Sequence, residues 1–198
     1  MGKEVNLSEF FWINKPGVFV IESNGLTIFT DPETDFWQQT YYGFQNDNGH
    51  VFVKEFEDDF TFSVKTDFKA LNQYDQCGII LYQDSGNWLK ASVEYENKSF
   101  ARLGSVVTNL GYSDWASTDI PSEVGSMWYR ISRRGQDFCI ENSTDGNIFM
   151  QMRIFHMHNP IAFARVGVYA CSPLKSSFKV TFSNLKSGPC VWADHLII

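Results

Sequence analysis

The sequence lacks what a membrane protein or a nucleic-acid-binding protein needs. Its 16 Lys and Arg face 23 Asp and Glu, for a net charge of −7, so it has no basic surface to contact phosphate groups. No segment is long and apolar enough to span a bilayer, and the first residues lack the apolar stretch of a secretory signal. We therefore expect no nucleic acid, no membrane and a cytoplasmic location.

Metal and cofactor motifs are also missing. The four cysteines lie far apart and form no Cys-x-x-Cys motif, which favours reduced thiols in a protein without a signal peptide. A reactive Cys171 would need an activating His, and none lies nearby in the sequence. His156 and His158 would share one strand face, but two ligands are too few for zinc. No Ser–His–acid arrangement or Gly-rich phosphate loop is present. We expect no cofactor and no metal.

The sequence instead repeats an alternation of apolar and polar residues. In the run from Gly78 to Ala116, the residues Leu89, Ala91 and Val93 alternate with polar or aromatic neighbours. Period two is typical of half-buried antiparallel strands, and polar turns such as 84–87 and 134–137 separate these strands. Helical periodicity is scarce, apart from a short helix predicted near 33–38. The pattern predicts an all-β sandwich or jelly roll of two antiparallel sheets, as a single domain over 1–198.

The polar side of the alternation carries candidates for ligand binding. Aromatic rings stack on the apolar faces of sugars, while charged groups and amides bond hydroxyl groups. The outward set is Trp88, Lys90, Glu94, Trp128, Arg130, Glu141 and Tyr169. We expect Trp88, Lys90, Glu94, Arg130 and Glu141 to share one outer sheet face, with Leu89, Ala91, Val93, Ile131, Ile140 and Val168 inside. The alternative is that Lys90–Glu94 and Arg130–Glu141 are ordinary surface pairs.

Polar-aromatic loops add further candidates for the end of this groove. Asn48-Gly49 predicts a tight turn between two strands, and it is flanked by Tyr42 and His50. Asp75 and Gln76 precede the strand that begins at Cys77. The predicted ligand-binding set is completed by Tyr42, Asn48, His50, Asp75 and Gln76. The acidic residues Asp31, Glu33 and Asp35 match no calcium loop, and a solvated turn is the better interpretation.

Three classes of function stay open from the residues alone. Glu94 and Glu141 would serve a glycoside hydrolase as acid and base, if their separation suited one scissile bond. A carbohydrate-binding module would need only exposed aromatic rings along a concave face. A non-enzymatic protein that binds a partner is the third class.

Five long segments resemble the regulation-of-enolase family, formerly a domain of unknown function within the concanavalin-A-like lectin/glucanase superfamily. They are YYGFQNDNGHVF (41–52), YDQCGIILYQDSGNWLKASVEYE (74–96), GSVVTNLGYSDWA (104–116), WYRISRRGQDFCIENSTDG (128–146) and VGVYACSP (166–173). The resemblance implies a concanavalin-A-like jelly-roll sandwich, a cytoplasmic protein and a link to enolase and sugar metabolism. It carries no catalytic residues. The expected function is therefore non-enzymatic regulation of carbohydrate metabolism through a partner, with enolase as the candidate, or through a sugar or sugar-phosphate ligand.

Overall fold

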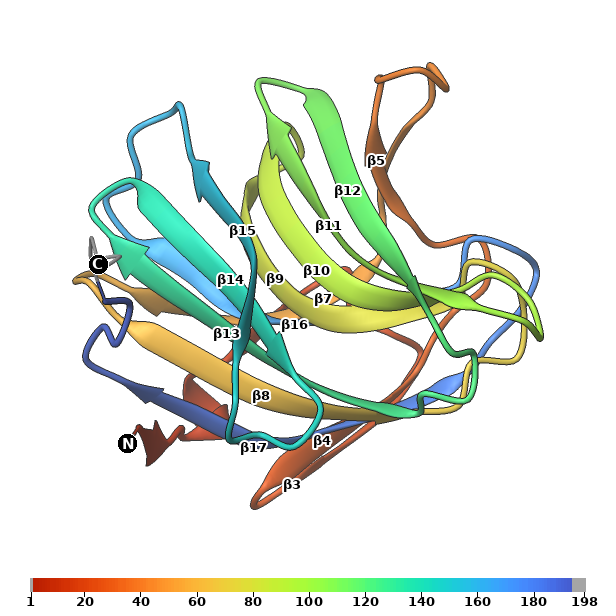
Figure 1. Cartoon of the computed structure of the whole chain (residues 1–198), viewed down its shortest axis with the longest axis horizontal. Helices are drawn as coiled ribbons and strands as arrows, with labels where there is room; N and C mark the ends of the chain where they lie inside the picture. The colour runs from red at the N-terminus through yellow and green to blue at the C-terminus, as the bar shows by residue number, and fades with distance from the viewer. Residues whose placement is uncertain (1, 194–198) are drawn as a thin grey trace.

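The alternating segments form two antiparallel sheets packed face to face, as the sequence predicts (Figure 1). The computed structural model describes residues 2–193; Met1 and residues 194–198 of the predicted domain lie outside the described part. The eight-stranded sheet runs in the order β15 (Met150–His156), β14 (Asp137–Ser143), β13 (Ser126–Arg134), β8 (Thr61–Phe68), β17 (Lys179–Gly188), β4 (Gly25–Phe29) and β3 (Val18–Glu22), with β1 (Lys3–Glu4) paired to β17.

The second large sheet has seven strands and carries most of the features discussed below. Its order is β12 (Tyr112–Ile120), β11 (Ala101–Asn109), β10 (Asn87–Tyr95), β9 (Gln76–Asp84), β16 (Ala164–Cys171), β7 (His50–Phe56) and β2 (Phe11–Ile13). A separate hairpin, β5 (Phe36–Gln38) and β6 (Gln45–Asp47), and a 3-10 turn, η1 (Leu7–Glu9), complete the elements. Within residues 2–193 no helix is long and apolar enough to cross a membrane.

The prediction of which apolar residues face the core is confirmed. The six residues predicted to lie inside are all buried in the main core between the sheets: Leu89, Ala91, Val93, Ile131, Ile140 and Val168. Successive strand residues point to opposite faces of a sheet, so the apolar pattern alone fixes which side faces the core.

The prediction of one shared outer face is wrong. Trp88, Lys90 and Glu94 lie on β10 in the seven-stranded sheet, whereas Arg130 and Glu141 lie on β13 and β14 in the eight-stranded sheet. A sandwich has two outer faces, one on each side, and alternation cannot distinguish them. The assignment depends on the pairing of β13 with β8, between segments about 60 residues apart in the chain, which no local pattern encodes.

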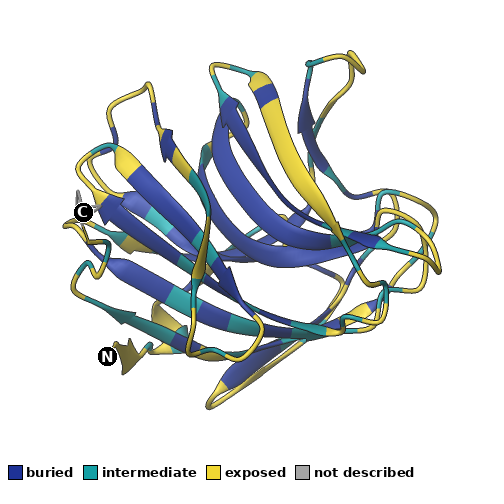
Figure 2. Cartoon of the chain, viewed as in Figure 1, coloured by how far each residue is buried: buried dark blue, intermediate teal, exposed yellow. Residues whose placement is uncertain are grey.

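A second, smaller core lies on the outer face of the seven-stranded sheet. There the hairpin places Phe36 against three rings of the sheet, with centroids 6.1 Å from Tyr82, 5.5 Å from Trp88 and 6.1 Å from Tyr169. Residues Phe36–Gln38 therefore form a strand, and the short helix predicted near 33–38 is wrong, because pairing with β6 and burial of Phe36 override the local signal. In Figure 2 strands β9 to β11 are largely buried, while β12 is exposed.

We predict that Trp88→Ala destabilises the fold rather than merely weakening a ligand site. Trp88 is 0% exposed, so its removal leaves a cavity that lowers the free energy of unfolding by about 3–5 kcal/mol. Urea denaturation measures this change. Tyr112→Ala, on the exposed edge strand, is the control and should stay within about 0.5 kcal/mol of the parent. Equal effects of the two changes would contradict the second core.

Candidate functional site

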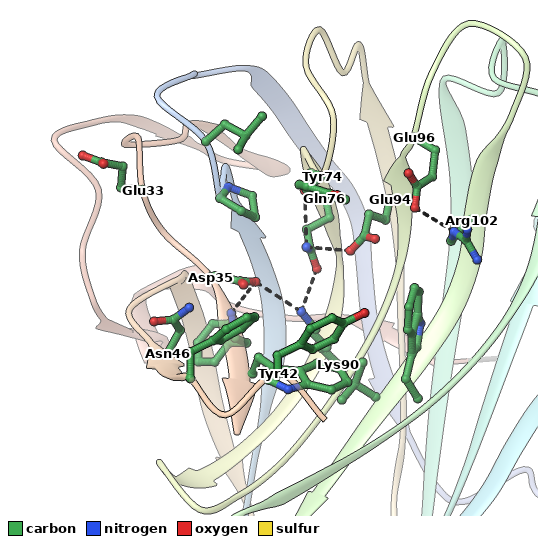
Figure 3. A pocket seen from close by; sticks show the side chains of 17 residues that line it. Glu33, Asp35, Tyr42, Asn46, Tyr74, Gln76, Lys90, Glu94, Glu96 and Arg102 are labelled. Carbon is green, nitrogen blue, oxygen red and sulfur yellow. Dashed lines mark hydrogen bonds and ion pairs between the residues drawn. The ribbon is translucent and has the colours of Figure 1, made fainter. Parts of the chain in front are cut away.

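The hairpin covers only part of the outer face, and the uncovered part is a pocket of about 790 Å³ (Figure 3). Strands β9 to β12 supply one side, and the hairpin and the segment 173–174 lie opposite; single residues that flank these strands, Glu33, Asp35, Tyr74 and Glu96, complete the lining. The residues lining it are Glu33, Asp35, Phe36, Trp37, Tyr42, Phe44, Asn46, Tyr74, Gln76, Lys90, Glu94, Glu96, Arg102, Val106, Trp115, Pro173 and Leu174.

Strand register brings the polar groups of three strands together. Glu94 on β10 lies directly opposite Arg102 on β11 and Gln76 on β9. Two residues back, Ser92 lies opposite Gly104 and Gly78, and this row of small residues separates the polar row from Lys90. A Cβ on Gly104 would come within 2.9 Å of the Ala116 carbonyl oxygen, so the backbone itself requires glycine there.

A continuous chain of polar contacts runs along the floor of the pocket (Figure 3). The Lys90 ammonium Nζ donates to Gln76 Oε1 at 2.8 Å and lies 3.7 Å from Asp35 Oδ1. Gln76 Nε2 donates in turn to Glu94 Oε2 at 2.8 Å. Lys90 is buried, and a buried ammonium is tolerated only when its donors and its charge are matched. Gln76 and Asp35 provide that match.

A second charged pair closes the side of the pocket next to β12. Arg102 Nε donates to Glu96 Oε1 at 2.7 Å, and its guanidinium carbon lies 5.4 Å from the ring centroid of Trp115. Both cations that line the pocket, Lys90 and Arg102, are thus paired with protein carboxylates. A guanidinium over an indole is stabilised by the ring quadrupole. This contact holds the half-exposed Trp115 ring in its position beside Arg102.

Glu94 has an unusual protonation equilibrium. Burial raises its pKa from the ordinary 4.5 to about 7, and Asp35 and Glu96 add to the rise while Lys90 and Arg102 oppose it. Part of its side chain still faces the pocket. Near neutral pH this carboxyl group therefore changes between a hydrogen-bond donor and a pure acceptor.

Aromatic rings form a wall beside this polar floor. Trp37 contacts both Trp115, at a centroid distance of 6.5 Å, and Tyr42, at 5.4 Å. Tyr42 stacks on Phe44 at 5.4 Å with an interplanar angle of 18°. We call Trp115, Trp37, Tyr42 and Phe44 the aromatic row. Apolar walls with a few convergent polar groups are typical of small-molecule sites.

Four of the predicted ligand-binding residues line this pocket: Tyr42, Gln76, Lys90 and Glu94. Trp88 and Tyr169 instead lie beneath Phe36 in the second core. They are one layer away from the pocket, and the Tyr169 hydroxyl group is linked to it by donating to Gln76 Oε1 at 3.1 Å.

The predicted loop residues Asp75, His50 and Asn48 hold the backbone around the pocket. Buried Asp75 accepts hydrogen bonds from the hydroxyl groups of Ser172 and Ser176. His50 Nε2 accepts from the Asp31 backbone NH at 2.9 Å.

The tight turn predicted at Asn48-Gly49 is instead a bend, in which both backbone NH groups donate to the Asp35 carbonyl, and it joins β6 to β7, which belong to different sheets. It is therefore not the connection of a hairpin. Asn48 Oδ1 accepts from the Asp35 backbone NH at 2.9 Å, and this contact fixes the position of Asp35 at the pocket.

Trp128, Arg130 and Glu141 lie on the opposite side of the molecule and do not belong to the pocket. Arg130 makes a bidentate pair with Glu141 at 2.6 and 2.7 Å and covers the Phe149 ring at 4.1 Å. Arg130 and Glu141 therefore form an ordinary surface pair, which was the alternative to a shared groove. Glu94 and Glu141 lie on different sheets, so they cannot act on one glycosidic bond. A glycoside hydrolase that uses these two residues as its acid and base is therefore not possible.

The sequence prediction missed Asp35, Glu96, Arg102 and Trp115. Arg102 could have been found, because the polar turn 97–99 joins two alternating strands and sets Arg102 opposite Glu94. Asp35 could not, because it directly precedes the hairpin, whose packing on the sheet depends on contacts distant in sequence.

Comparison with known proteins agrees with this architecture. The model of one protein family matches residues 12–190. The chain belongs to that family, described as "Protein of unknown function (DUF1349)". The chain is also 35% identical over 181 residues to "Regulation of enolase protein 1" of Saccharomyces cerevisiae, covering 91% of this chain and 90% of the relative. The resemblance to the regulation-of-enolase family is thereby confirmed.

Solved structures confirm the fold of this DUF1349 protein. A functionally unknown protein from Saccharomyces cerevisiae superimposes with a TM-score of 0.88 at 33% identity, covering 95% of this chain and 100% of that one. A mutant GH43 protein from Bacillus licheniformis gives a TM-score of 0.71 at 14% identity, covering 90% of this chain and 36% of that one. The second likeness concerns the fold alone.

We predict that Glu94→Gln changes how stability depends on pH. Below pH 4.5 the Glu94 carboxyl is neutral in both states. Between 4.5 and about 7 the unfolded chain loses this proton while the folded one keeps it, so the parent loses stability as pH rises. Gln cannot ionise. The free energy of unfolding of the variant relative to the parent should therefore rise by roughly 1–3 kcal/mol from pH 4.5 to 8.

Urea denaturation at both pH values measures this difference. Glu141→Gln, in the surface pair on the other sheet, is the control that should lack it. A difference between Glu94→Gln and the parent that is independent of pH would contradict the raised pKa.

Proposed function

We propose that this protein is a non-enzymatic regulatory protein that binds a small, neutral polyhydroxylated ligand of the sugar class in the pocket. The observation that carries this proposal is the chain of contacts Asp35–Lys90–Gln76–Glu94 beneath the aromatic row. Carboxylate, amide and ammonium groups in one row offer the mixed donors and acceptors that hydroxyl groups need. The neighbouring rings offer an apolar surface for the face of a sugar.

The charges of the pocket favour a neutral ligand over a sugar phosphate. Four carboxylates, from Glu33, Asp35, Glu94 and Glu96, line the pocket with two cations, and each cation already has a carboxylate partner. A phosphate would have to displace one of these partners and leave a partly buried carboxylate without its counter-charge, which is costly. We therefore favour neutral sugars and polyols over the sugar phosphates included in the initial expectation.

The name of the yeast relative supports a regulatory role and makes enolase a candidate partner. We extend both to this protein as part of the proposal, together with the cytoplasmic location. Sugar binding and partner binding are compatible, because the outer face of the eight-stranded sheet lies on the other side of the sandwich from the pocket.

We predict that neutral sugars, and not sugar phosphates or glycolytic acids, raise the melting temperature and bind in calorimetry. Glu94→Gln should weaken binding roughly ten-fold or more at pH 8, because a charge-assisted hydrogen bond is lost. The loss should nearly vanish at pH 5, where the parent is also neutral at this position. Trp115→Ala should weaken binding at both pH values.

Arg130→Ala is the matched control for this screen. It removes an equally ordered charge on the opposite sheet and should leave the affinity unchanged. Binding confined to phosphorylated sugars, or an equal loss in Arg130→Ala, would refute the pocket as the neutral-sugar site. No binding by any neutral sugar would refute the proposed ligand class.

We predict that purified enolase co-elutes with this protein in gel filtration and that its turnover changes when the protein is added. The yeast relative that carries the enolase name is 35% identical to this chain over 90% of its own length, and this similarity motivates the test. Bovine serum albumin in place of this protein is the control for nonspecific effects. Separate elution and unchanged turnover at micromolar concentrations would exclude direct regulation of enolase.

A further inference from the structure

We propose that the ligand is a linear oligosaccharide, whose first ring occupies the polar floor and whose next ring stacks on the exposed pair Tyr42 and Phe44. This inference rests on the proposed sugar-binding function and adds the length of the ligand to it. The pocket volume of about 790 Å³ lies in the upper part of the range for small-molecule sites, about 300–1,000 Å³, which leaves room beyond one sugar ring.

The aromatic row leads from the polar floor out to the tip of the hairpin. Trp115 stands beside Arg102, and contacts through Trp37 and Tyr42 continue the row to Phe44. Tyr42 and Phe44 remain 53% and 44% exposed although both line the pocket. Exposed aromatic rings that continue a pocket provide apolar surface for a ligand longer than the pocket floor.

The chemistry of the wall changes along this path. The charged groups lie at the floor and at the base of the hairpin, whereas the tip, QTYYGF (39–44), carries no charge. A second ring at the tip would therefore be held mainly by stacking. That arrangement suits the repeating unit of an oligosaccharide, since every unit presents a similar apolar face, while the first ring alone is recognised by polar groups.

The tip is held rigidly in a costly backbone conformation. Gln39 and Tyr41 have positive φ values of 55° and 63°, which non-glycine residues rarely adopt. Backbone bonds between Gln39 and both Gly43 and Phe44 close the turn, and Gln39 Nε2 ties it to the Gly111 carbonyl at 2.9 Å. Such strain persists where the surroundings enforce it, commonly at ligand sites, and fixed rings lose little entropy on binding.

Calorimetry with ladders of one to four sugar units tests the inference, using gluco-, xylo- and manno-oligosaccharides as probes. We expect the affinity for at least one ladder to rise about ten-fold from one unit to two or three, the effect of burying roughly 60 Å² more apolar surface. Tyr42→Ala and Phe44→Ala should bring the ratio of these affinities close to one. Tyr42→Phe should restore most of it, because the ring and not the hydroxyl group carries the contact.

Tyr112→Ala is the matched control, since Tyr112 is an aromatic residue that is 62% exposed and does not line the pocket. It should keep the full dependence on length. Monosaccharide binding with no gain on lengthening would overturn this inference and leave the proposed function standing. Absence of binding along every ladder would overturn both. Loss of enolase co-elution in Tyr42→Ala, with an unchanged sugar ladder, would instead assign the tip to a protein partner.

Discussion

The pocket depends on the packing of one side chain, Phe36, onto the outer face of the seven-stranded sheet. Phe36 lies among Tyr82, Trp88 and Tyr169 and is completely buried. This contact attaches the hairpin to the sheet and turns an outer sheet face into an interior. The hairpin then supplies Trp37, Tyr42 and Phe44 to the pocket, and Asp35 directly precedes its first strand. Burial of a few aromatic rings, driven by the hydrophobic effect, thus positions the groups of the wall that the hairpin carries.

The same packing explains how a lysine comes to lie inside the protein. Lys90 stands next to Trp88 on the outward side of β10, and its ammonium lies about 6 Å from the rings of both Trp88 and Tyr169. Without the hairpin it would be an ordinary solvated side chain. With the hairpin it needs Gln76 and Asp35 as partners, and Gln76 passes the connection on to Glu94. The polar floor is therefore a consequence of the second core.

The sequence predicted the fold and part of the candidate pocket, and individual residues show why. Alternation in 88–95 separated Leu89, Ala91 and Val93 from the outward residues, because a strand has a strict period of two. It could not show that Arg130 belongs to the other sheet, since both sheets present an outward face. Nor could it show that the outward Trp88 would be covered, because Phe36 is about 50 residues away in the chain. Glu94, Lys90, Gln76 and Tyr42 were found by chemical type, and Asp35 was missed because its place follows from the hairpin.

The row Gly78, Ser92 and Gly104 bears on how the family could diversify. Two of its three positions cannot accept even a methyl group, since a Cβ on Gly78 would overlap the Ala91 carbonyl and one on Gly104 would crowd the Ala116 carbonyl. The geometry of the sheet between the polar row and Lys90 is therefore set by close approach of the main chain. Substitutions of Tyr42, Phe44 and Leu174 would change the side chains that line the pocket, while the main-chain geometry of this row stays as it is. Ligand preference can thus change by point mutation without a change of fold.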